Sequence, residues 1–121
     1  MNIQPEINKA IGAHGMWKQR LRGAVNTGKS EFSVAVVCQD NQCEFGKWLY
    51  ALEPQVKASK HWVCVKSLHA DFHREAAGVL GLALSGKKSE AEAALSESSK
   101  FNLTSMKLTV EMMAWAKAPA A

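Results

Sequence analysis

Two histidines one helical turn apart are the residues of this sequence with the clearest potential for metal chemistry. They are His69 and His73, within the apolar segment 68–73. Residues four apart in a helix project from the same face, about 6 Å apart along the axis. Two neutral imidazoles at this spacing are half of a tetrahedral metal site. The pair therefore predicts a metal centre if the chain supplies two further donors.

His14 and Cys43 are the candidates for those two donors. His14 lies between Ile11 and Trp17 in an apolar stripe, so its ring should face the core, where a polar group needs a partner. Cys43 comes at the start of a short helical pattern, and a helix N-terminus stabilises the thiolate that binds zinc. The alternative is that His14 is a hydrogen-bonded packing residue and that Cys43 is a small buried hydrophobe.

The two other cysteines and the fourth histidine are weaker candidates. An odd count of three cysteines, in a chain expected to be cytoplasmic, favours reduced thiols. Cys38 and Cys64 are expected to be small buried hydrophobes. His61 is rotated about 80° from His69 and lies two turns away. The predicted site therefore leaves these three residues out.

Hydrophobic periodicity predicts helices over most of the chain. Three long helices are expected over about residues 3–25, 54–85 and 90–116, and a short one over 42–52. Pro54 suits the first turn of the second long helix, and Ser89 with Glu92 is typical of a capping box at the start of the last. The valine-rich run 32–38 is interpreted as an irregular or short helical connector, because a lone strand would have no partner.

These elements predict an all-α fold, an antiparallel bundle of three long helices with one short helix and an irregular connector. At 121 residues the chain is long enough for one domain with a real core. We expect a single domain over residues 1–117 and a frayed tail or the start of a linker over 118–121.

Composition and charge exclude several classes of function. The chain is 47% hydrophobic and 21% charged, and no window is long and apolar enough to span a membrane, so a cytoplasmic protein is expected. Fifteen basic residues against eleven acidic ones leave a formal charge of +4. The basic residues are scattered among acids and lack interleaved aromatics, which argues against nucleic-acid binding.

Four donors, His14, Cys43, His69 and His73, lie on segments whose apolar faces must meet in one core. Three neutral imidazoles and one thiolate satisfy the tetrahedral geometry of a zinc ion. One shared Zn²⁺ accounts for three histidines in apolar stripes better than three separate hydrogen-bonding accidents. The sequence therefore predicts a zinc site with these four ligands.

The same residues carry a family resemblance. The segment 14–21 (HGMWKQRL), the block 43–48 (CEFGKW) and the segment 69–73 (HADFH) resemble the ordered signature of the chemoreceptor zinc-binding domain, or CZB. The resemblance implies a helical bundle, often dimeric, with a zinc site of three histidines and one cysteine. By matching position, the ligands are His14, Cys43, His69 and His73.

The resemblance also implies a function. Members of the family accompany chemoreceptor signalling regions or domains that synthesise cyclic di-GMP, and they report zinc or oxidants to them. We therefore expect a non-catalytic sensory or regulatory domain, with the zinc ion, a second copy of the chain and a signalling output in cis or in trans as partners. Oxidation of Cys43 or loss of zinc is expected to move the helices that the ligands connect.

Three alternatives remain open from the sequence. A zinc hydrolase needs an open coordination position and a general base, but Asp71 should point about 160° away from the two histidines of its helix. A di-iron bundle recruits carboxylates from core faces, and here the acidic residues lie mainly outside. The third alternative is a metal-free interaction bundle in which the histidines simply pack.

Overall fold

The computed structural model describes residues 3–118, and all regular structure in that range is helical. The helices are α1 (Gln4–Thr27), α2 (Val34–Val37), α3 (Glu44–Ala51), α4 (Pro54–Lys57), α5 (Lys60–Leu84), α6 (Lys88–Ala94) and α7 (Lys100–Lys117). The predicted all-α class is confirmed. No helix within the described range is long and apolar enough to cross a membrane.

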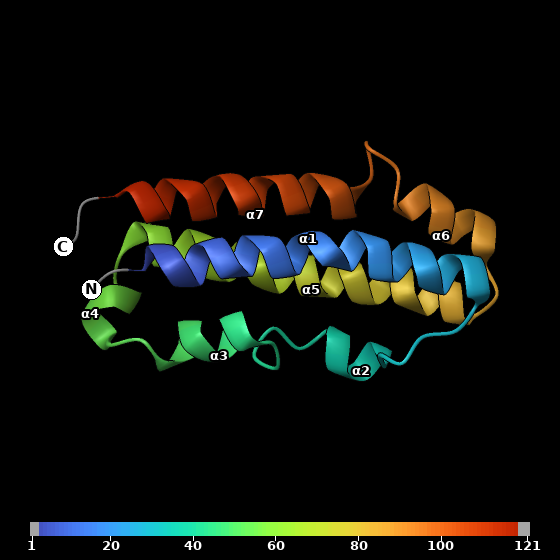
Figure 1. Cartoon of the computed structure of the whole chain (residues 1–121), viewed down its shortest axis with the longest axis horizontal. Helices are drawn as coiled ribbons and strands as arrows, with labels where there is room; N and C mark the ends of the chain where they lie inside the picture. The colour runs from blue at the N-terminus through green and yellow to red at the C-terminus, as the bar shows by residue number, and fades with distance from the viewer. Residues whose placement is uncertain (1–2, 119–121) are drawn as a thin grey trace.

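The chain crosses the molecule four times, and each crossing runs opposite to the one before (Figure 1). The first crossing is α1, and the second is the broken segment 28–59, which carries α2, α3 and α4. The third is α5, which runs in the same direction as α1, and the fourth is α6 with α7. Helix α5 contacts each of the other six helices. The bundle is therefore antiparallel along the chain, and α5 is its central element.

The apolar stripes predicted from the sequence form the core. Buried positions on α1, α5 and α7 include Ile7, Leu21, Phe72, Leu80, Leu108, Met112 and Trp115. They recur at the three-and-four spacing of a single helix face. Because His14, His69 and His73 interrupt these stripes and are themselves buried, the fold forces three polar rings into an apolar interior.

The predicted start of the second long helix was wrong. Pro54 opens only the four-residue helix α4, and α5 begins at Lys60. Ser59 is the reason, because its extended backbone breaks the helix and its hydroxyl accepts a hydrogen bond from the backbone N–H of Trp62. A serine in this geometry caps a new helix and ends the old one.

The last predicted helix is also divided, and the capping box was placed wrongly. Ser89 lies inside α6, whose N-cap is Lys87 without a side-chain cap. Ser99 caps α7 instead, accepting from the backbone N–H of Asn102. The segment 95–99, in which Leu95 is followed by four polar residues, therefore separates two helices. Of the predicted tail, residues 119–121 lie outside the described part of the chain.

A glycine in the first turn of α3 allows the preceding loop to approach that helix closely. At Gly46 an added Cβ would overlap the backbone carbonyl oxygen of Asp40. The loop that leads to Cys43 therefore folds directly over the first turn of α3, and only a residue without a side chain leaves room for it. The tight loop holds Cys43 at the helix N-terminus.

Replacing Gly46 by alanine should lower the free energy of unfolding by about 1 to 3 kcal/mol, the usual range for overpacking. The reason is the overlap with Asp40, which forces the loop or the helix to shift. Denaturant unfolding of both proteins measures the effect. Gly12→Ala is the matched control, because Gly12 lies in the interior of α1 with open space around it. That change should stabilise the helix by up to about 1 kcal/mol. Equal effects of both changes would contradict the role given to Gly46.

Candidate metal centre

The four predicted donors come from three helices that meet near the middle of the bundle. His14 lies in the middle of α1, and His69 and His73 lie one turn apart on the facing side of α5. Cys43 is the N-cap of α3 on the second crossing. The structure thus brings together residues up to 59 positions apart, from 14 to 73, because α1, α3 and α5 pack against one another.

One ligand atom from each of the four residues lies within 4.8 Å of the other three. The Nε2 atom of His69 is 3.1 Å from Nε2 of His14 and 3.1 Å from Nε2 of His73, and 3.3 Å from Sγ of Cys43. A zinc ion with Zn–N bonds of about 2.0 Å and Zn–S bonds of about 2.3 Å sets neighbouring donors of its tetrahedron roughly 3.3 to 3.6 Å apart. The donor set is therefore close to the dimensions of a zinc shell.

Two backbone carbonyls fix the orientation of two of the rings. Nδ1 of His14 donates to the carbonyl oxygen of Ala10 at 2.8 Å, and Nδ1 of His73 donates to that of Val37 at 2.9 Å. A carbonyl oxygen only accepts, so in the neutral ring the proton is on Nδ1 and Nε2 carries a lone pair. Both lone pairs are aimed at the cluster, which is the usual arrangement of metal-binding histidines.

His69 has no comparable partner. Its side chain is fully buried, and within the described part of the chain its Nδ1 atom has no hydrogen-bond partner. A proton on Nε2 of His69 can serve one neighbouring lone pair, but not both imidazoles and the sulfur. A bound cation would satisfy all four donors at once, so the residues present fit a metal ion.

Burial keeps the three imidazoles neutral. It lowers the pKa of His14 to about 4, helped by the charge of His73 and opposed by the hydrogen bond to Ala10. It lowers the pKa of His69 to about 2, with smaller contributions from the two neighbouring histidines. The pKa of His73 is also lowered by burial, against the hydrogen bond to Val37 and the charge of Asp40. Neutral imidazole is the form that binds a metal.

Cys43 departs from expectation in one respect. It is the N-cap of α3 as predicted, and its Sγ accepts a hydrogen bond from the backbone N–H of Gly46 at 3.3 Å. Burial nevertheless raises the pKa of the Cys43 thiol, outweighing that N–H group. The helix N-terminus alone therefore does not give a thiolate, and the metal must displace the proton.

The remaining candidates lie outside the cluster. Cys38 and Cys64 are exposed, so their expected burial was wrong; each falls on a solvent-facing position of its helix or turn. His61 is not part of the group of donors. Asp71 forms an ion pair with Arg74 on the partly exposed side of α5, which agrees with its predicted outward direction.

Asp40 is a neighbour of the site that the sequence did not single out. Its charge acts on both Cys43 and His73. Its carboxylate accepts a hydrogen bond of 2.6 Å from the hydroxyl of Tyr50. Burial, that hydrogen bond and the Asp40 charge together raise the pKa of Tyr50 to about 12. Residues 40–41, Asp and Asn, are types that favour a turn, but nothing in their type predicts a contact with the donors.

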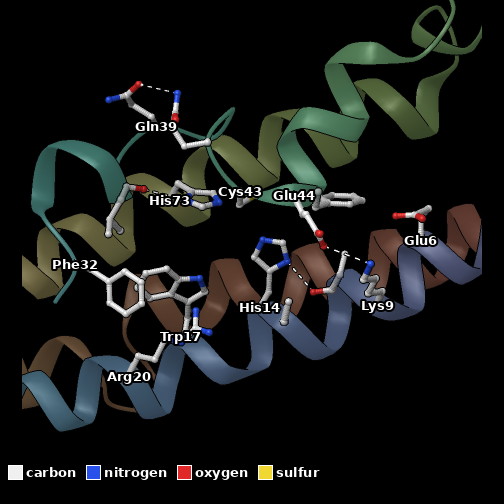
Figure 2. Close-up of a pocket in the computed structure, with 15 residues that line it drawn as sticks. Glu6, Lys9, His14, Trp17, Arg20, Phe32, Gln39, Cys43, Glu44 and His73 are labelled. Carbon is white, nitrogen blue, oxygen red and sulfur yellow. Dashed lines mark hydrogen bonds and ion pairs between the residues drawn. The ribbon is translucent and has the colours of Figure 1, made fainter. Parts of the chain in front are cut away.

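A cleft of about 260 Å³ opens beside the donors, between α1 and the segment 32–45. Figure 2 shows His14 rising from α1 towards Cys43 and His73 on the opposite wall. These three residues line the cleft, whereas His69 lies behind them. One side of the candidate centre is therefore open to small molecules.

Comparison with known proteins rests on a single finding. No curated protein and no solved structure matches the chain. The family model of the chemoreceptor zinc-binding domain matches residues 14–80, which is more than half of the chain and includes all four clustered donors. This protein therefore belongs to the chemoreceptor zinc-binding (CZB) domain family.

Proposed function

We propose that the chain is a non-catalytic sensory or regulatory domain that binds Zn²⁺ through His14, Cys43, His69 and His73. The observation that supports it best is the convergence of one donor atom from each residue within 4.8 Å. When bound, the zinc ion supplies one positive centre that lowers the pKa of the thiol and joins the donors. The residues then hold α1, α3 and α5 in one arrangement.

The sensory role follows from which elements the donors connect. His14 and the histidine pair lie on the two parallel crossings, while Cys43 lies on the broken crossing between them. Loss of the ion would leave opposing lone pairs in an apolar core, so we propose that these three elements shift. Hydrogen peroxide, a two-electron oxidant, would act in the same sense, converting the Cys43 thiolate to a sulfenate with water as the second product.

We also propose which signalling process the domain regulates. Family membership supports a signalling partner, in the same chain or in another, and we propose chemotaxis or cyclic di-GMP synthesis in the cytoplasm as the regulated process.

We further propose that residues 1–117 act as one unit, because α7 packs along α1 and α5 over its whole length. Nucleic acid and membrane have no place in this scheme.

Two observations favour binding over catalysis. The donor group contains no carboxylate among the described residues, whereas hydrolytic zinc sites and di-iron bundles employ them. The two carboxylates beside Cys43 are both engaged, that of Asp40 by the Tyr50 hydroxyl and that of Glu44 by Lys9. A metal-free packing role is disfavoured by the lone pairs that meet at the cluster, because one proton on Nε2 of His69 can serve only one of its three neighbours.

Zinc content and proton release test this function together. Protein made without a histidine tag should carry close to one zinc per chain by elemental analysis. At pH 7 the buried imidazoles are neutral and the thiol is protonated, so zinc binding should release about one proton, from Cys43. Calorimetric titration in two buffers of different ionisation enthalpy measures that number.

Variants identify the source of the proton. Cys43→Ser should abolish the release, and Cys64→Ser, at an exposed cysteine of α5, should leave it unchanged. Absence of zinc, or release of two or more protons, would contradict the proposed ligand set and its protonation.

We also propose that the domain forms a homodimer through α7. This helix lies at an edge of the bundle (Figure 1). It carries a stripe of exposed apolar residues. The stripe comprises Leu103, Met106, Val110 and Met113, which are 46%, 58%, 63% and 46% exposed. Their spacing of three, four and three residues is that of a helix-pairing seam. Such a surface is uncommon on a monomer.

The stripe is complementary to itself. In an antiparallel two-fold pairing centred near residue 108, Met106 of one copy lies opposite Val110 of the other. In the same register Leu103 of one copy lies opposite Met113 of the other, and the reverse contact forms by symmetry. Each residue of the stripe therefore meets an apolar residue of the second copy.

Val110→Lys should convert the dimer to a monomer, because symmetry brings two lysines into one apolar seam. Light scattering coupled to size-exclusion chromatography measures the mass. Val36→Lys, on α2 at the opposite side of the bundle, is the control at a similarly exposed valine. A dimer that survives Val110→Lys would place the interface elsewhere.

A further inference from the structure

The cleft beside the donors has a second, cationic end that the zinc site does not explain. Trp17, Arg20 and Phe32 lie together there, whereas Glu6 and Lys9 lie at the other end (Figure 2). The volume of about 260 Å³ is below the roughly 300 to 1,000 Å³ of sites for drug-sized ligands. The cleft therefore suits a molecule of about amino-acid size.

Arg20 is the charged group of this end. Its guanidinium carbon lies 5.1 Å from the ring centroid of Trp17 and 5.3 Å from that of Phe32. Within the described residues Arg20 forms no ion pair, whereas Lys9 at the far end is paired with Glu44 at 3.4 Å. Two aromatic faces thus hold a planar cation in place while leaving its N–H groups unpaired with any carboxylate.

The charge balance of the cleft favours an anion. A zinc ion with one thiolate and three neutral imidazoles carries a net charge of about +1, and Arg20 adds a second positive charge to the cleft. The Lys9–Glu44 pair is neutral, and Glu6 lies away from Arg20. Asp40 does not line the cleft, and its carboxylate accepts a hydrogen bond from Tyr50. A carboxylate is the group that a guanidinium binds with two parallel hydrogen bonds.

We propose that this cleft is the entrance through which small carboxylate-bearing chelators reach the metal donors, with Arg20 binding their carboxylate. The proposal rests on the proposed zinc site. A chelator in the cleft would reach the zinc from the side of His14, Cys43 and His73, because these three residues line the cleft and His69 does not. Zinc exchange with amino acids or short thiol peptides then depends on a residue that is not a ligand.

Zinc removal by L-cysteine and by cysteamine tests this role. Both probes place a thiol and an amine two carbons apart, and only L-cysteine carries a carboxylate. Zinc-loaded protein is mixed with excess probe, and the zinc that stays bound is measured after desalting at successive times. For each variant, the rate of zinc removal by L-cysteine is divided by the rate by cysteamine. The two probes differ in chelating strength, but this difference is the same for every variant, so a change in the ratio between variants reports the carboxylate contact.

Arg20→Gln should lower the ratio of the L-cysteine rate to the cysteamine rate by about 5-fold or more, because the lost contact is a charge-assisted one. Arg22→Gln is the matched control, since Arg22 is exposed and lies about 200° around α1 from Arg20. Circular dichroism confirms that both variants fold. The expected result is a ratio that falls for Arg20→Gln alone.

Two results would overturn the proposal while leaving the zinc site intact. One is an unchanged ratio in Arg20→Gln, and the other is an equal fall in Arg22→Gln, which would indicate a general effect of charge. Failure of the zinc site itself would be recognised earlier, because the starting protein would then contain no stoichiometric zinc.

Discussion

Zinc affinity should fall by more than about 100-fold when Cys43 is replaced by serine. Changes to groups that merely orient ligands cost about 10- to 100-fold, and removal of a ligand must cost more. Serine keeps an oxygen that can accept from the backbone N–H of Gly46, so the cap of α3 survives. At pH 7 its hydroxyl is not a zinc ligand comparable with a thiolate. Competition titration with a chromophoric chelator measures the affinity.

The histidines should behave in the same way, and the exposed cysteine should not. His14→Ala removes a donor that is 3.1 Å from His69, so a comparable loss of affinity is expected. Cys64→Ala removes a thiol that is exposed on α5 and outside the cluster, so affinity should be unchanged. Similar losses for the Cys43, His14 and Cys64 variants would contradict binding of the metal at this cluster.

The donors could be predicted because they break a pattern. A histidine within an apolar stripe has to face the core, and two histidines four residues apart on one helix have to face it together. His14, His69 and His73 were found in this way, and all are buried near one another. Cys43 was found from its place before a short helix, where the structure has its N-cap.

The helix boundaries were less predictable, because serines compete as caps. Ser89 has a glutamate three residues later and suits a capping box, yet Ser99 begins the long helix α7. Ser59 likewise interrupts a stretch that looked continuous from Pro54. Which serine caps a helix depends on where each crossing must turn to pack along α5. Local sequence does not contain that information.

The groups that support the site could not be predicted at all. Ala10 and Val37 orient two imidazoles through backbone carbonyls, which any residue type provides. The burial of Cys43, which decides the direction of its pKa shift, depends on the loop over Gly46. The exposure of Cys38 and Cys64 depends on which faces of α2 and α5 other helices cover. These properties arise only when segments distant in sequence meet.

Acid should unfold the metal-free protein well before its carboxylates titrate. In the unfolded chain the histidines have pKa values near 6.5, whereas in the folded protein the pKa of His14 is about 4 and that of His69 about 2. Below about pH 6.5 the unfolded state therefore binds protons that the folded state does not. Stability is full above that pH and falls as the pH drops towards 4. His14 alone accounts for about 3 kcal/mol over this range, an appreciable part of the roughly 5 to 15 kcal/mol of a typical domain.

Denaturant unfolding at a series of pH values, in the presence of a chelator, measures this dependence. Each buried imidazole contributes up to about 1.4 kcal/mol per pH unit to the slope of the free energy of unfolding against pH. The three together should therefore give a slope of up to about 4 kcal/mol per pH unit. His14→Asn should remove one third of that slope, because asparagine does not titrate. Its amide can still donate to the carbonyl of Ala10, so the hydrogen bond of the folded state is kept. The same change at His61, outside the cluster, controls for residue type. A metal-free protein whose stability stayed level between pH 6.5 and 4 would mean that the three rings are already protonated or exposed, and the compact donor cluster would then exist only with its metal.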